Sequence, residues 1–300
     1  MRRVLFRLLY LLYFLNLLYF TSACRKPAPP HLTIGSKFFT EQVILAELLA
    51  QHIEARTGIP VLRKTNLGGT LLVHKALLSG DLDLYVEYTG TALTAVLNES
   101  PSPNDTSASI YARVKNQYDQ RFHLDLTDSL GFENTFAMVI RGDDAQNLHL
   151  RTMSDLAPIA PQWRAGVGYE FLERPDGFRG WSTRYALHFA AQPNVMDLGL
   201  LYRALVDHQV DIVAGNSTDG LIDSLHLVAL EDNLHYFPPY DAVPIVRRDA
   251  LEKFPQLRAV LADLAGKLTA AEMRHLNAQV DAGQRDVAAV VRAFRASKNL

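Results

Sequence analysis

A segment that occurs twice along the chain constrains the fold more than any other feature of the sequence. Residues 75–88 read as the end of a helix, a turn and a strand, and residues 203–216 repeat this pattern at an offset of 128 positions. Ala, Leu and Asp recur in place, while Lys and Arg, Leu and Val, and Leu and Ile replace one another. The repeat predicts two similar α/β units, and the alternative is a chance likeness between two short segments.

The two copies also indicate where a ligand would bind. Each copy ends in a turn rich in Gly and in Thr or Ser, and the last strand residues are Tyr88 and Asn216. In open α/β sheets, ligands lie at the carboxyl ends of the strands. We therefore expect Tyr88 and Asn216 at equivalent corners of two lobes, facing one cleft.

Strands and helices alternate along the rest of the chain. The apolar pattern predicts that Leu82, Leu84, Val86 and Tyr88 share one face of a strand, while the polar residues 98–109 predict a surface loop. The last 50 residues are expected to be mostly helical. We expect strands at 32–36, 61–65, 82–88, 134–141, 163–168 and 211–215, and helices at 41–56, 71–78, 181–189 and 200–207.

The N-terminus has the features of an export signal. Three arginines precede an apolar run at 8–20, which is too short for a comfortable membrane span and fits the core of a signal peptide. Small residues then lead to Cys24, the only cysteine of the chain, in an arrangement similar to a bacterial lipobox, although Thr21 stands where Leu is usual. This pattern predicts that residues 1–23 are a signal peptide.

We interpret Cys24 as the lipidated first residue of the mature chain and residues 24–31 as a Pro-rich tether. A single acyl chain binds a membrane only weakly, whereas several acyl chains would anchor the protein stably. We therefore expect the protein in the periplasm or at the outer face of the cytoplasmic membrane. Cleavage by ordinary signal peptidase and retention as an uncleaved anchor are the alternatives.

Charge and composition exclude several classes of protein. The formal net charge is −2, and it becomes −5 without the three arginines of the predicted signal, so nucleic-acid binding has no electrostatic support. The sequence has no Gly-x-Ser-x-Gly, His-Glu-x-x-His or P-loop motif, and its ten histidines show no metal-ligand spacing. We expect no enzyme activity, no cofactor and no metal.

Six short motifs occur in order along residues 32–300. They are Ile34-Gly35-Ser36-Lys37-Phe38-Phe39-Thr40-Glu41-Gln42, Thr65-Asn66-Leu67-Gly68-Gly69-Thr70, Glu87-Tyr88-Thr89-Gly90-Thr91, Arg174-Pro175-Asp176-Gly177, Ser217-Thr218-Asp219-Gly220 and Phe237-Pro238-Pro239-Tyr240. Together they resemble the motifs of one family, the glycine betaine/choline/carnitine substrate-binding proteins of osmoprotectant ABC transporters.

The resemblance implies the α/β, two-lobed fold of type II periplasmic binding proteins (venus flytrap), with the ligand cleft between the lobes. Lobe I would comprise residues 32–134 and 238–300, and lobe II residues 135–237. The protein would be a monomer that captures a quaternary amine and delivers it to a membrane permease. It would close about hinge strands near residues 133–134 and 237–240.

The resemblance also implies a set of ligand contacts. Aromatic faces attract a quaternary ammonium, and Arg or N–H groups suit a ligand carboxylate. Asn216 stands where many members have another cage tyrosine, which opens room, so Asn216→Tyr should tighten glycine betaine binding. The implied contacts are Tyr88, Phe136 and Tyr240 as aromatic walls, Thr91 and Arg174 as polar contacts, and Lys37 and Asn216 as further lining residues.

Structural roles would also explain these residues. Tyr88 and Phe136 fit a strand core, Tyr240 fits packing at the hinge, and Asn216 fits ordinary turn chemistry. Arg174 fits a surface turn or a pair with an Asp, and Lys37 a solvated or paired cation.

Other functions remain open at this stage. The protein could have the same fold and bind a different polar amine or an ergothioneine-like betaine. It could also be a sensory lipoprotein without a transport role. Genes for a permease and an ATPase beside this one would favour transport.

Overall fold

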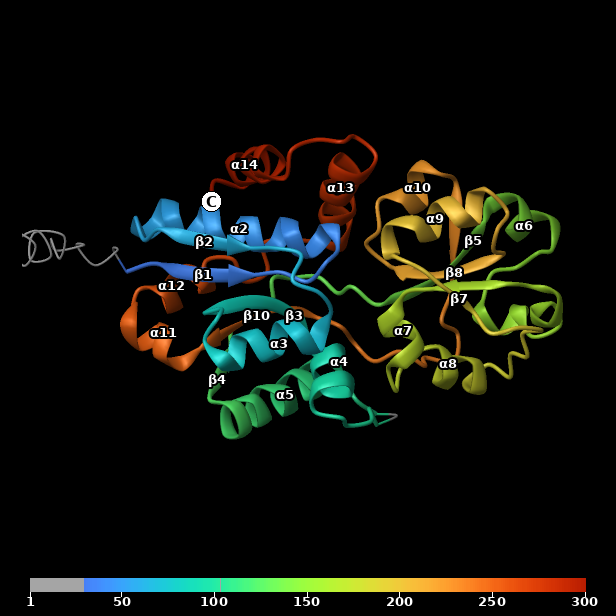
Figure 1. Cartoon of the computed structure of the whole chain (residues 1–300), viewed down its shortest axis with the longest axis horizontal. Coiled ribbons are helices and arrows are strands. Elements are labelled where there is room, and N and C mark those ends of the chain that lie inside the picture. Colours follow the sequence, from blue (N-terminus) through green and yellow to red (C-terminus); the bar gives the residue numbers. More distant parts are fainter. Residues whose placement is uncertain (1–29, 103) are drawn as a thin grey trace, which may run out of the picture. The chain divides into compact units, whose positions relative to one another are not determined.

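Two mixed five-stranded sheets organise residues 32–300 (Figure 1). The computed structural model describes residues 30–102 and 104–300, so the predictions for residues 1–29, Cys24 among them, fall outside it. In these described ranges, no helix is both long and apolar enough to cross a lipid bilayer. The strand order of the first sheet is β2 (Val61–Lys64), β1 (Leu32–Gly35), β3 (Leu84–Tyr88), β10 (Ala242–Arg247) and β4 (Leu124–Leu126). The strand order of the second sheet is β7 (Asn194–Val195), β6 (Ala165–Val167), β8 (Ile212–Asn216), β5 (Phe136–Arg141) and β9 (Leu227–Leu230).

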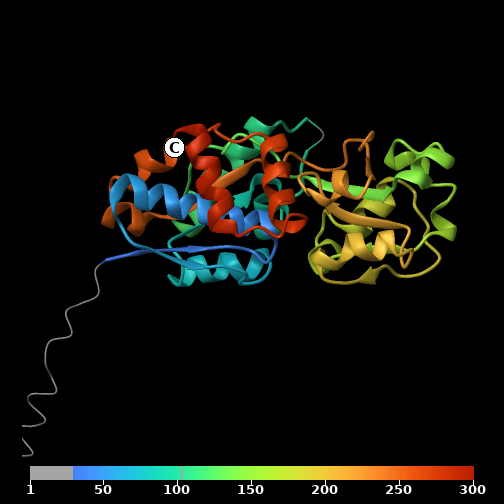
Figure 2. The same cartoon turned by 90° about the horizontal axis from the view of Figure 1, so that it is seen from above.

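Helices cover both sheets, and we call each sheet with its helices a lobe. The last helices of the chain return to lobe I, where α13 and α14 pack in one apolar core with α2 (Figure 2). Lobe I contains α2 (Thr40–Thr57), α3 (Thr70–Ser79), α4 (Thr89–Thr91) with a π-helical turn at Ala92–Val96, α5 (Ser107–Phe122), α11 (Arg248–Lys253), α12 (Leu257–Ala262), α13 (Ala270–Asp281) and α14 (Val287–Lys298). Lobe II contains α6 (Gly142–Asn147), α7 (Tyr169–Glu173), α8 (Phe178–Arg184), α9 (Leu198–Val206) and α10 (Leu221–Ser224), with 3₁₀ turns at Met153–Leu156 and Ala160–Gln162.

This architecture confirms the predicted two-lobed α/β fold. The chain enters lobe II after β4 and returns to the first sheet with β10. The residues at which one lobe gives way to the other, near 134 and 237, stay a prediction. Two crossing segments run side by side there, because Glu133 and Asp241 form an antiparallel bridge and the Asn134 N–H donates to the Tyr240 carbonyl at 3.1 Å.

The sequence repeat corresponds to one structural unit used twice. Helix α3 leads into β3, α9 leads into β8, and each of these strands is third in its sheet. The repeated Asp makes the same bonds in both copies. Asp83 accepts the Thr33 N–H at 2.7 Å, and Asp211 accepts the Arg164 N–H at 2.8 Å. Each carboxylate thus holds the start of the strand segment beside its own.

An arginine completes each copy. Arg247, the last residue of β10, donates to the Leu77 carbonyl at 3.2 Å, and Arg141, the last residue of β5, donates to the Leu205 carbonyl at 2.9 Å. Leu77 and Leu205 are themselves 128 residues apart, which is the offset of the repeat. Four equivalent groups therefore recur in matching places, and a chance likeness is excluded.

The strand that ends at Tyr88 differs from the prediction at its start. Leu84, Val86 and Tyr88 belong to the core shared with α2, as expected, but Leu82 lies in the opposite core, beneath α3 and α5. The strand begins only at Leu84, so Leu82 belongs to the preceding turn and does not follow the alternation of the strand.

The predicted helix at 181–189 is also wrong in its bounds. Helix α8 ends at Arg184, and Ala186 adopts a left-handed backbone with φ of 51°. Tyr185 and Leu187 are both buried in the lobe II core. Two residues that are two positions apart lie on different faces of a helix, so a continuing helix would not bury both. The predicted loop at 98–109 likewise ends early, because Thr106 caps α5.

The duplicated carboxylates lead to a test of the fold. Asp83→Ala and Asp211→Ala should each lower the free energy of unfolding by about 1–3 kcal/mol, because each leaves a backbone N–H without its acceptor. Urea denaturation would measure both. The exposed neighbour Asp81 bonds only Ser79 through its side chain and provides the control Asp81→Ala. Equal stability of all three variants would contradict the structural role of the repeat.

Candidate ligand-binding site

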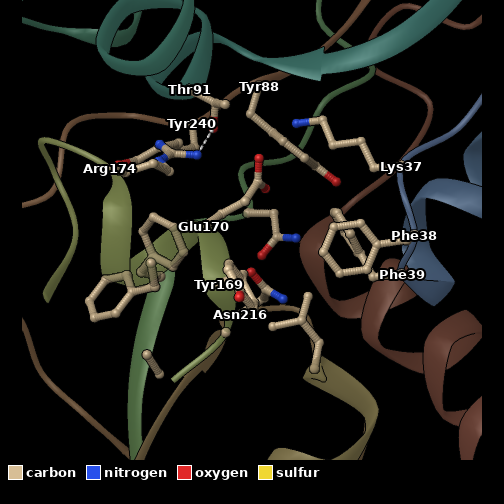
Figure 3. Close-up of a pocket in the computed structure, with 16 residues that line it drawn as sticks. Lys37, Phe38, Phe39, Tyr88, Thr91, Tyr169, Glu170, Arg174, Asn216 and Tyr240 are labelled. Atoms are coloured by element: carbon tan, nitrogen blue, oxygen red, sulfur yellow. Dashed lines mark hydrogen bonds between the residues drawn. The ribbon is translucent and has the colours of Figure 1, made fainter. Parts of the chain in front are cut away.

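One cavity between the lobes, the cleft cavity, is lined by all seven residues that the sequence proposed (Figure 3). Its empty volume, counted with the solvent at its mouth, is about 590 Å³. Tyr88 ends β3 and Asn216 ends β8, so the two copies of the repeat meet here as expected. Lobe I contributes Lys37, Tyr88, Thr91 and Tyr240, and lobe II contributes Phe136, Arg174 and Asn216. Their role in binding stays a prediction.

Lys37 is buried in the cavity wall and forms an ion pair with Glu87. Glu87 is fully buried on β3, next to Tyr88. The Lys37 ammonium also lies over the Tyr88 ring, 5.2 Å from its centroid. An ammonium has three donors, so the bond to Glu87 leaves capacity for an acceptor in the cavity.

Arg174 is held by Asp176 in a two-pronged pair, with Nε to Oδ1 at 2.8 Å and an Nη to Oδ2 at 2.6 Å. The guanidinium also donates to Thr91 Oγ1 at 3.0 Å, and Tyr240 donates its hydroxyl to Asp176 at 2.5 Å. The ion pair raises the pKa of Arg174. It also lowers the pKa of Asp176, although burial acts in the opposite direction. Lobe II is thereby bonded to Thr91 and Tyr240 of lobe I.

The two cations cover part of the aromatic wall. Arg174 Cζ lies 5.0 Å from the Phe136 ring and 6.0 Å from the Tyr240 ring. Phe136 also packs against Phe171, at 4.7 Å between centroids, and against Phe237 at 5.6 Å. Phe136 therefore belongs to an aromatic cluster and also lines the cavity.

Asn216 sits at a strand end and also takes part in turn chemistry. Its backbone N–H donates to Asp219 Oδ2 at 2.8 Å, and Tyr202 donates its hydroxyl to the same oxygen. Burial raises the pKa of Asp219 to about 6. The turn that follows β8 is therefore organised by one partly desolvated carboxylate.

Sequence reasoning missed part of the wall. Phe38 and Phe39 lie beside Lys37 in a motif that was already recognised, and Phe39 stacks on Tyr88 at 6.4 Å and 22°. Tyr169, Glu170 and Phe171 directly follow β6, so the rule about strand ends would have found them. The aromatic wall is thus larger than three rings. The missed residues are Phe38, Phe39, Asn134, Gly168, Tyr169, Glu170, Phe171, Leu198 and Ala214.

Glu170 joins the two lobes at the cavity. Its Oε1 accepts the backbone N–H of Thr70, the first residue of α3, at 2.6 Å. A carboxylate at this end of a helix also interacts favourably with the helix dipole. A Cβ on Gly69 would lie 2.6 Å from the same oxygen, so a larger residue at this position of the Gly68-Gly69-Thr70 motif would displace the Glu170 carboxylate.

Glu41 is a buried carboxylate behind the cavity that receives donors from four parts of the chain. Its Oε1 accepts from the Tyr88 hydroxyl at 2.5 Å and the Asn134 amide at 2.8 Å. Its Oε2 accepts from the Thr218 hydroxyl at 2.5 Å and the Asn277 amide at 3.2 Å. All four donors are neutral, and burial raises the pKa of Glu41.

The comparisons with known proteins give the family. The model of a family described as the substrate-binding domain of ABC-type glycine betaine transport systems matches residues 30–297. The chain belongs to this family. As a member, it is an extracytoplasmic substrate-binding protein of a quaternary-amine ABC importer and not an enzyme.

Individual relatives agree with this membership. The carnitine transport binding protein OpuCC of Listeria monocytogenes is 35% identical over 93% of this chain and 92% of its own length. An ergothioneine transport permease/ergothioneine-binding protein of Helicobacter pylori, EgtU, is 34% identical over 88% of this chain and 47% of its own. A solved structure described as a glycine betaine/carnitine/choline ABC transporter has a TM-score of 0.74 at 31% identity, covering 89% of this chain and 98% of that one.

The raised pKa of Glu41 leads to a test of the buried site. A carboxyl whose pKa is higher in the folded state contributes stability that is present below its unfolded pKa, about 4.3, and is lost as the pH rises through the folded pKa. Wild type should therefore lose unfolding free energy relative to Glu41→Gln as the pH increases across that window. Urea denaturation from pH 4 to pH 8 would measure the difference.

The exposed Glu252→Gln variant is the control for this measurement. The pH dependence of its difference from wild type should be much smaller than that of Glu41→Gln. If the Glu41→Gln difference stays constant with pH, the carboxyl of Glu41 does not titrate as its burial requires.

Proposed function

We propose that this protein captures a quaternary amine osmoprotectant, such as glycine betaine or choline, and delivers it to the permease of an ABC importer. One observation carries this proposal: seven residues chosen from sequence motifs line one cavity, where aromatic rings accompany a basic end. Family membership and the ligands named for the relatives support the same ligand class.

The aromatic wall suits the ammonium end of such a ligand. A quaternary ammonium has no N–H to donate, and each aromatic face near it contributes about 0.5–2 kcal/mol depending on desolvation. Lys37 and Arg174 already lie over Tyr88 and Phe136, so the ammonium is best served by the remaining rings, Phe38, Phe39 and Tyr169. Figure 3 shows these rings away from Thr91 and Arg174.

Thr91, Lys37 and Arg174 suit a ligand carboxylate. The Thr91 hydroxyl accepts a bond from Arg174, which leaves its own proton free to donate. Lys37 keeps two donors beyond its bond to Glu87. Because both cations are neutralised by buried carboxylates, they act as fixed hydrogen-bond donors and add little net charge.

Closure of the lobes would complete the site. Ligand docks on one lobe, and the other closes over it by bending at the two crossing segments near Asn134 and Tyr240. The bonds of Glu170 to Thr70 and of Arg174 to Thr91 join the lobes on the cavity wall, which suits contacts that form on closure. The closed form then engages the permease.

Binding of quaternary amines is the first prediction of this function. Isothermal titration calorimetry of the full chain in detergent should show micromolar or tighter binding of at least one of glycine betaine, choline, carnitine, proline betaine and ergothioneine, with proline and glutamate silent. Tyr88→Leu should weaken that binding about 2- to 30-fold, since it removes the ring against which the Lys37 ammonium and the Phe39 ring are held in the cavity wall.

The matched variant Tyr88→Phe separates two explanations of such a loss. It keeps the ring and removes only the hydroxyl that bonds Glu41. Affinity near that of wild type would assign the effect to the ring. Silence of the folded wild-type protein toward every quaternary amine would overturn the proposed function.

We also propose that Cys24 carries the lipid anchor. Wild type expressed in a bacterial host should fractionate with membranes and incorporate labelled palmitate, whereas Cys24→Ala should lose the label. An unlabelled wild-type protein would show that the cysteine is not processed, and the anchor would then be withdrawn while the binding function stands.

A further inference from the structure

A second cavity, the side cavity, adjoins the cleft cavity. The two share four lining residues, Phe38, Phe39, Leu198 and Asn216, which therefore lie at their common border. The empty volume of the side cavity, counted with the open solvent in it, is about 1140 Å³, compared with about 590 Å³ for the cleft cavity. Several residues of the recognised motifs line this space, but apart from Asn216 the ligand contacts described above lie outside it.

The two cavities differ in their charged groups. The cleft cavity has Lys37, Arg174 and Glu170 in its wall, whereas the residues that line the side cavity include two carboxylates, Asp219 and Asp281, and no Lys or Arg among the described residues. Within the described part of the chain, Asp281 accepts the Thr40 hydroxyl through Oδ1 alone, and Asp219 accepts its hydrogen bonds through Oδ2 alone. Each carboxylate thus keeps an oxygen for a further donor.

Asn216 stands between the two spaces. Its backbone N–H donates to Asp219, and its Nδ2 lies 3.5 Å from the same carboxylate oxygen. Its side chain is half-buried and lines both cavities. In Figure 3, Asn216 lies on the side of the cleft cavity away from Thr91 and Arg174. A ligand with its carboxylate at Lys37 and Thr91 therefore points its other end toward Asn216. An aromatic ring at this position would fill the passage that the short amide leaves.

We propose that the side cavity is a second subsite, which accepts the far end of betaines that carry a hydrogen-bond donor beyond the ammonium, such as a ring N–H or a hydroxyl. Asp219 accepts that donor, and Asn216 decides whether it reaches the carboxylate. This inference rests on the proposed binding of quaternary amines and specifies its substrate class. Glycine betaine, which has no such extension, uses the cleft cavity alone.

Calorimetry with two probes, glycine betaine and ergothioneine, tests the subsite on the full chain at pH 7.5. This pH lies above the pKa of about 6 that burial gives Asp219, so the carboxylate can accept. Ergothioneine carries a ring N–H on a side chain that branches from the carbon bearing its trimethylammonium group and its carboxylate. Asn216→Tyr should weaken ergothioneine at least tenfold and tighten glycine betaine. Asn216→Ala, which leaves the passage open, should keep ergothioneine within a few-fold of wild type.

The control is Asn147→Tyr, the same change at an exposed residue of α6, which should alter neither affinity. Thermal unfolding of each variant confirms that it is folded. If Asn216→Tyr shifts both ligands by the same factor, or if wild type binds glycine betaine and not ergothioneine, the subsite is refuted while the proposed function stands. If wild type binds no quaternary amine, the subsite and the proposed function are both refuted.

Discussion

A single buried carboxylate, that of Glu41, joins the parts of the protein that must meet for the cleft cavity to exist. Its four donors come from the end of β3, the first crossing segment, the turn after β8 and helix α13. Two of these segments also line the cavity through Tyr88 and Asn134. Removing a carboxylate from water is costly unless its oxygens are bonded, and here four neutral donors offset part of that cost while burial still raises the pKa of Glu41. The position of the Tyr88 ring therefore depends on a residue outside the cavity.

Each cation in the cavity wall is paired with its own anion. Lys37 is paired with Glu87 and Arg174 with Asp176, and all four side chains are buried or nearly so. Buried pairs of this kind add little net stability, but loss of one partner leaves a costly unpaired charge. Their effect is to fix donors in place beside aromatic rings. Such a wall offers fixed hydrogen-bond donors for the carboxylate of a zwitterion and aromatic rings for its ammonium.

The repeat explains why one cleft serves both lobes. Two copies of a helix–turn–strand unit, each held by its own Asp and Arg, direct the ends of β3 and β8 to the same space. The copies have diverged where they face the ligand, with Tyr88 in one and Asn216 in the other. The first keeps an aromatic wall, and the second leaves a passage toward acidic groups. The repeated unit provides the frame, and under the proposed function the strand-end residues would provide the specificity.

The sequence by itself determined the two α/β units and most strands and helices, because periodicity and turn residues are local signals. It also placed Tyr88 and Asn216 at the cleft from the repeat, while the other five of the seven cavity residues came from the resemblance of short motifs to those of the family. It misplaced Leu82 and the end of α8, and it missed Tyr169 and Glu170. Only the tertiary structure decided which groups meet. Glu170 and Thr70 are 100 residues apart, and Glu41 and Thr218 are 177 apart. Such pairs form only when both lobes have folded and come together, so no local pattern records them.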